Sequence, residues 1–187
     1  MNLSHRFFHT LAMAIILVPL GVAGCSSTRA TTDPRISAID QIRKLLELPG
    51  QPLVFVEMTG MINSPSGNLE VALYQDSDGR KYSVDAGTNQ VVEIDARVIL
   101  SNIPPNAPTL SFDELKAKAM KYFQATILGF NSLQSSWKYE EGSKGDNSFF
   151  TWYGEIKPGS MNRPFAQIGL YKSGELFAYY NTLSLEK

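Results

Sequence analysis

The sequence predicts an α+β protein made of two repeats, each with one helix packed on an antiparallel β-meander. Two observations support this class. Apolar residues recur at helical spacing in two segments, over residues 36–46 and 110–127. Each segment is followed by short strand-like runs, which Gly, Asn and Asp residues separate as tight hairpins require. The predicted order is therefore helix, meander, helix, meander.

An apolar segment at the start of the chain predicts a signal peptide over residues 1–24. A short region with Arg6 precedes an apolar run over residues 11–24, and Pro19 interrupts this run. A membrane span needs about 20 apolar residues, whereas the apolar part of a signal peptide is shorter. We therefore expect residues 1–24 to be removed and to contribute nothing to the fold.

The only cysteine of the chain, Cys25, follows this run directly. Val22, Ala23 and Gly24 precede it, and the four residues together resemble the bacterial lipobox. The resemblance implies that Cys25 is acylated, with palmitate for example, and becomes the first residue after cleavage. We expect an extracytoplasmic lipoprotein anchored to a bacterial membrane, the outer membrane if the cell has two, with residues 25–33 as a polar tether. The alternative is an ordinary signal peptide with a chance cysteine.

Removal of the leader leaves a chain with little catalytic chemistry. Both histidines, His5 and His9, lie in the leader, and Cys25 carries the lipid. Imidazole and thiol catalysis, disulfides and His or Cys metal sites are then excluded. The 17 basic and 18 acidic residues form no long basic cluster, so nucleic acid is not an expected partner. We expect a protein that is not an enzyme and that folds without metal or cofactor.

The first repeat is predicted over residues 34–102. Asp33 is a candidate N-cap with Pro34 at the first helical position, and Pro49 ends the helix. A proline-rich segment over residues 103–108 marks the boundary to the second repeat. Strands are predicted at residues 53–58, 69–75, 81–85 and 91–95, with turns at 76–79 and 86–89.

The second repeat is predicted over residues 109–187. Ser111 and Glu114 form a capping-box pair, and Leu110 with Leu115 forms a hydrophobic staple at the same helix start. Both repeats therefore share the same predicted order of elements. Strands are predicted at residues 137–141, 149–155, 165–171 and 176–180, with a hairpin turn at 172–175.

Three stretches carry a resemblance to a known family. "KYSVDAGTNQVVEID" in the first repeat, and "SFDELKAKAMKYF" with "GLYKSGELFAYY" in the second, resemble tandem PepSY domains. The resemblance implies small α+β modules at the cell envelope that inhibit or escort peptidases, with no catalytic residues to carry over. The chain departs from the family pattern at Gly87-Thr88-Asn89, where Thr-Gly is common, and in the longer loop over residues 60–68.

Aromatic residues concentrate in the second repeat and indicate a binding surface. Trp152 with Tyr153, and Tyr179 with Tyr180, are neighbours on predicted strands. Neighbouring strand residues point to opposite faces, and a single helix covers only one face. We therefore expect these four residues to include a surface that binds a protein or peptide partner. The alternative is a second core layer supplied by the first repeat.

The expected function is that of a membrane-anchored binding or regulatory lipoprotein that modulates a peptidase or recognises a peptide. One alternative is a carboxylate- or lysine-dependent hydrolase of envelope polymers, and another is a structural accessory subunit of an envelope complex. A buried acidic pair in a pocket favours the hydrolase, an open apolar sheet edge favours the binder, and a large flat apolar patch favours the subunit. The residues weighed for catalysis or calcium binding are Ser135, Lys138, Glu140, Glu141, Glu155, Asp76, Asp78 and Asp85.

Overall fold

The computed structural model describes residues 33–65 and 67–185, without the side chains of residues 61–63 and 184. The predicted signal peptide, Cys25 and the tether up to residue 32 lie outside these residues. Thr32–Lys187 form one compact unit, which contains all the elements described below. Within the described part of the chain, no helix combines the length and the apolar character needed to cross a bilayer.

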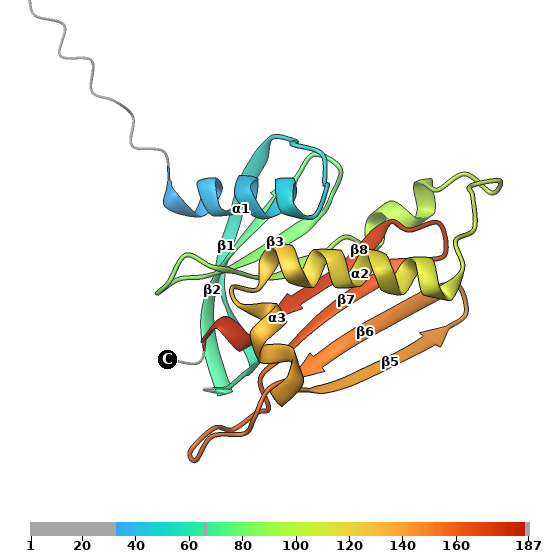
Figure 1. Cartoon of the computed structure of the whole chain (residues 1–187). Helices are drawn as coiled ribbons and strands as arrows, with labels where there is room; N and C mark the ends of the chain where they lie inside the picture. The colour runs from blue at the N-terminus through green and yellow to red at the C-terminus, as the bar shows by residue number, and fades with distance from the viewer. Residues whose placement is uncertain (1–32, 66, 186–187) are drawn as a thin grey trace, which may run out of the picture. The chain divides into compact units, whose positions relative to one another are not determined.

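A single antiparallel sheet of eight strands dominates the fold (Figure 1). The strand order across this sheet is β1-β2-β3-β4-β8-β7-β6-β5, so β1 and β5 are its edges. The strands are β1 (Leu53–Ser64), β2 (Gly67–Asp76), β3 (Lys81–Asp85), β4 (Val91–Asp95), β5 (Lys138–Lys144), β6 (Asn147–Tyr153), β7 (Phe165–Tyr171) and β8 (Leu176–Asn181).

The predicted architecture of two helix-on-meander repeats is wrong, because the strands belong to one sheet. The junction lies between β4 and β8, where Ile94 pairs with Tyr179 and Asp95 pairs with Ala178. A free strand edge exposes unpaired N–H and C=O groups, and the pairing of β4 with β8 satisfies both edges at once. The proline-rich segment over residues 103–108 lies outside the sheet, between the 3₁₀ helix η1 (Arg97–Asn102) and the next helix.

Two longer helices, α1 (Pro34–Leu45) and α2 (Phe112–Thr126), lie over the same face of the sheet (Figure 1). Both predicted helix starts are confirmed. The Asp33 carboxylate accepts the Arg35 N–H at 3.0 Å, and the Ser111 N–H donates to the Glu114 carboxylate at 2.7 Å. Beyond α2 the chain continues through α3 (Phe130–Leu133) and η2 (Gln134–Ser136), and the described part ends with η3 (Leu183–Leu185).

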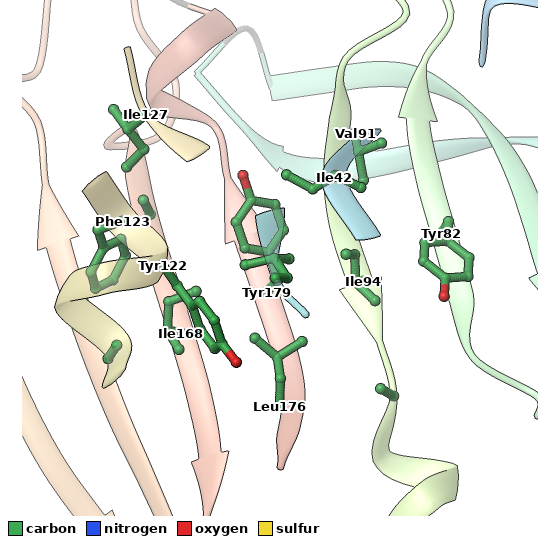
Figure 2. Close-up of a cluster of buried hydrophobic side chains, with 14 of the residues drawn as sticks. Ile42, Tyr82, Val91, Ile94, Tyr122, Phe123, Ile127, Ile168, Leu176 and Tyr179 are labelled. Atoms are coloured by element: carbon green, nitrogen blue, oxygen red, sulfur yellow. The ribbon is translucent and has the colours of Figure 1, made fainter. Parts of the chain in front are cut away.

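One hydrophobic core fills the space between the helices and the sheet. Helix α1 packs on β3 and β4, and α2 packs on β6 and β7. Figure 2 shows Ile42 of α1 beside Val91, and on the other side of Tyr179 it shows Tyr122 and Phe123 of α2 with Ile127, the residue that follows this helix. Because Tyr179 of β8 lies between the two groups, the core runs without a break across the boundary that the sequence predicts.

A buried ion-pair network ties α1 to the hairpin between β2 and β3. The Asp76 carboxylate is fully buried and accepts from Arg43 at 3.2 Å, Arg80 at 3.3 Å and the Tyr82 hydroxyl at 2.8 Å. Burial is the main cause that raises the pKa of Tyr82 to about 12, so its hydroxyl remains a donor. The Asp76 carboxylate is therefore already paired with two arginines of the chain itself, so it does not fit the role of a calcium ligand.

Candidate functional site

The first candidate is the edge strand β1, which pairs with β2 and with no other strand in the described part of the chain. All residues from 54 to 60 are exposed. Four large apolar side chains contribute to this surface, with exposed fractions of 67% for Val54, 49% for Phe55, 46% for Val56 and 42% for Met58. We call these four residues the β1 edge patch.

The side chains of the β1 edge patch lie on both faces of the sheet. Phe55 pairs with Tyr74 and packs against its ring with the centroids 5.6 Å apart, which places it on the helix side. Val54 pairs with Gln75 and points to the other side. The register shifts between Phe55 and Glu57, so Val56 is an extra residue that divides β1 into two regular stretches. The helix side of this edge therefore carries Phe55 and Met58, and the other side carries Val54 together with Glu57.

The opposite edge, β5, is protected in the usual way, by charge. Lys138 and Glu140 form an ion pair at 2.5 Å, and Glu141 pairs with Lys116 of α2 at 2.8 Å. Charged side chains on an edge strand discourage pairing with another chain. Between residues 53 and 60, β1 carries a single charge, that of Glu57. The charged β5 edge therefore opposes pairing with a strand of another chain, whereas the β1 edge allows such pairing.

Two of the four predicted partner-binding residues, Trp152 and Tyr179, are buried in the core. Trp152 packs edge-on against Phe130 of α3 at 5.5 Å and tilted against Tyr139 of β5 at 4.7 Å. Strand alternation points both predicted residues toward the helices, where α2 and α3 exclude a partner. A surface role therefore does not fit Trp152 or Tyr179.

The other two, Tyr153 and Tyr180, lie half-buried on the face of the sheet without helices. Phe165 joins them, with ring centroids 6.3 Å from Tyr153 and 6.0 Å from Tyr180. The guanidinium of Arg163 lies 5.5 Å from the centre of the Tyr153 ring. Burial, and next the negative charge of Glu93, raises the pKa of Tyr180 to about 12. The rings of Tyr153, Phe165 and Tyr180 together form a second candidate surface.

Alanine substitution of Trp152 and Tyr153 is expected to separate core from surface. Trp152→Ala should lower the free energy of unfolding by about 3 kcal/mol, because a large buried ring leaves a cavity. Tyr153→Ala should cost about 1 kcal/mol or less, since its ring remains partly in water. Urea denaturation followed by circular dichroism measures both. Equal losses would mean that Tyr153 belongs to the core as well.

The residues weighed for catalysis do not form a site. Ser135 is exposed in η2, Lys138 is paired with Glu140, and Glu155 is exposed after β6. Asp85 accepts the N–H groups of residues 87 and 88 and so holds the turn between β3 and β4. Among residues 33–65 and 67–185, no three His, Cys, Asp or Glu side chains gather in a group that could hold a metal ion.

Comparison with known proteins gives no relative, since no family model, curated protein or solved structure matches the chain. The likeness to PepSY domains therefore stays a resemblance of short motifs. The sequence does predict a strand at residues 53–58, but its position at an open edge has no signal in the local pattern. That position is known only once the order of all eight strands is known.

Proposed function

We propose that this chain is a membrane-anchored, extracytoplasmic binding lipoprotein that recognises an extended segment of a partner protein by strand addition to β1. The observation that supports this proposal is the exposure of the β1 edge patch at an edge of the sheet. The anchor is the lipid expected on Cys25, and the partner is a protein of the same envelope compartment. Modulation of a peptidase through such a segment agrees with the resemblance to PepSY domains.

Strand addition uses the two features that β1 offers. Among residues 33–65 and 67–185, no strand lies beside the outer edge of β1, and an added strand supplies partners for its backbone N–H and C=O groups. Exposed side chains on alternate positions then provide specificity. Val54 on one face and Phe55 on the other allow apolar residues of the partner to pack on both sides of the sheet.

The hydrolase alternative has no comparable support. Among the described residues, the buried carboxylates are those of Asp76 and Asp85. Arg43 and Arg80 hold Asp76, and backbone N–H groups of residues 87 and 88 donate to Asp85, so both carboxylates have structural partners. A cavity of about 510 Å³ lies between α1 and the end of α2, and the described residues that line it are all uncharged. An open apolar edge is the feature that the binding function requires, and the structure has it.

A photo-cross-linking amino acid placed in β1 of the full chain tests the proposal in cells. Benzoylphenylalanine at Val54 should form an adduct with a partner protein, because this position is exposed beside the free edge. The same residue at Phe112 of α2 is the matched control, since Phe112 is an exposed apolar residue that packs on Phe150 of β6, which is far from β1 in strand order. Adding Val56→Lys and Met58→Lys should reduce the Val54 adduct at least fivefold.

The adduct mass also tests the nature of the partner. A band with the mass of two copies of this chain would show self-association through β1 and overturn recognition of another protein. Equal adducts at Val54 and Phe112 would show unspecific contact and would overturn the role of the edge. Circular dichroism of the lysine variant should be unchanged, because its substitutions lie on an exposed strand.

A further inference from the structure

Two acidic side chains lie beside the β1 edge patch, one on each face of the sheet. Glu57 of β1 pairs with Leu73 and lies on the face without helices, whereas Glu70 of β2 pairs with Gly60 and lies on the helix side. Both side chains are exposed. Within the described part of the chain neither takes part in an ion pair, so both carboxylates are available to a partner.

The β1 residue opposite Glu70 is a glycine. Gly60 has no side chain to stand between the Glu70 carboxylate and a strand added beyond β1. A Cβ placed on Gly60 would meet the side-chain oxygen Oδ1 of Asn68 at 3.0 Å, so the Asn68 amide also borders this gap. Asn68 is exposed and lies two residues before Glu70, on the same face of β2. A carboxylate and an amide oxygen therefore flank an open glycine at the edge.

An added strand brings its own side chains close to these groups. Neighbouring strands lie about 4.8 Å apart, so one residue of the added strand faces Glu57 directly, and another lies about 10 Å from the Glu70 backbone, across Gly60. Lys and Arg side chains are long enough to cross the glycine to the carboxylate. Because Glu57 and Gly60 are three residues apart along β1, the two matching positions of the added strand are also three residues apart.

The part of the chain that surrounds β1 is acidic as well. Residues 33–102, which form α1, β1 to β4 and η1, contain ten acidic and six basic residues. Three of the six basic side chains already have aspartate partners, because Arg43 and Arg80 pair with Asp76 and Arg97 pairs with Asp95. Opposite charges on neighbouring strands stabilise their pairing, and like charges destabilise it. The β1 edge therefore repels an acidic segment and attracts a basic one.

We propose that the segment added to β1 is basic, with one Lys or Arg opposite Glu57 and a second, three residues away, that reaches Glu70 and Asn68 across Gly60. This inference rests on the proposed strand addition and names the chemistry of its partner. Main-chain hydrogen bonds and apolar contacts with residues such as Met58 supply affinity, and the two cations supply selectivity.

The probes are three labelled eight-residue peptides of valine and threonine that differ at two positions, three residues apart. These positions carry two lysines, two glutamines or two glutamates. The protein is the compact unit Thr32–Lys187, which contains the whole sheet and core. In fluorescence polarisation at low salt, the lysine peptide should bind about tenfold more tightly than the glutamate peptide, with the glutamine peptide between them. In about 1 M NaCl the difference should largely disappear, because the Debye length falls to about 3 Å.

Four variants locate the two charges. Glu57→Gln and Glu70→Gln should each reduce the preference for lysine over glutamate about threefold. Gly60→Val should act like Glu70→Gln, because its side chain fills the gap that the second lysine crosses. Asp113→Asn is the matched control, since it removes an exposed carboxylate from the first turn of α2, which packs on β6 and β7. This control should leave the preference unchanged.

Backbone methylation of the lysine peptide separates charge selection from strand addition. In an extended peptide one set of alternate N–H groups faces β1 and the other faces water, so one of two complementary methylation patterns should abolish binding while the other does not. Equal binding of the lysine and glutamate peptides, with this methylation response, would overturn the basic partner and leave strand addition standing. Binding that survives both methylation patterns would overturn strand addition itself. Absence of binding by the lysine peptide would overturn the basic segment as the ligand of this edge.

Discussion

Replacing Asp76 with alanine is expected to lower the free energy of unfolding by about 5 kcal/mol. The substitution leaves Arg43 and Arg80 largely buried without their shared carboxylate. It also removes the acceptor for the Tyr82 hydroxyl and for two backbone N–H groups of the β2–β3 turn. The loss is large because two buried guanidinium groups lose the carboxylate that they share, and each then keeps only a more exposed carboxylate, Asp40 for Arg43 and Asp78 for Arg80.

The matched control is an exposed ion pair of the same type. Asp95 and Arg97 lie 2.6 Å apart, and the Arg97 side chain is mostly in water. Asp95→Ala should therefore cost about 1 kcal/mol or less. Urea denaturation of Thr32–Lys187 at neutral pH measures both variants. A cost below about 2 kcal/mol for Asp76→Ala would mean that water or a rotated side chain replaces the carboxylate, and would contradict a structural role for this network.

Replacing Cys25 with serine is expected to abolish lipid attachment completely. Mass spectrometry of the original protein should show an N-terminal acylated cysteine, whereas the Cys25→Ser variant should keep residues 1–24 and gain no lipid mass. The physical consequence is large, because each acyl methylene buried in a bilayer contributes about 0.8 kcal/mol, and two or three chains make attachment effectively permanent.

A substitution beside the cysteine controls for general effects on export. Ser26→Ala removes a hydroxyl from the predicted tether but leaves the thiol, so its mass should match that of an acylated protein. Recovery of the original protein with an unmodified cysteine, or with another first residue, would contradict the lipoprotein prediction. The proposed β1 recognition would then concern a protein without a lipid anchor, and the Val54 cross-link would still test it.

Local features of the fold were predictable from short stretches of sequence. Ser111 and Glu114 satisfy the free N–H groups of a helix start with their own side chains, so the start of α2 depends on four residues alone. The turn between β3 and β4 is likewise built by Asp85 and its neighbours. Alternation also placed Trp152 and Tyr153 on opposite faces, although the pattern did not say which of them the helices cover.

The architecture and the candidate sites depend on contacts between distant residues. Pairing of Ile94 with Tyr179 makes one sheet from two predicted meanders, and this pairing has no sequence signal, since main-chain hydrogen bonds are available to every strand edge. The same pairing of β4 with β8 leaves β1 at an edge of the sheet.

The sequence by itself determined where the two longer helices begin and where the hairpins turn, because caps and turns are local properties. Only the tertiary structure decided that the sheet is continuous, that Trp152 and Tyr179 are core residues, and that β1 lies at an edge of the sheet. Each of these depends on which edges and faces meet, and that choice minimises exposed apolar surface and unpaired backbone over the whole chain.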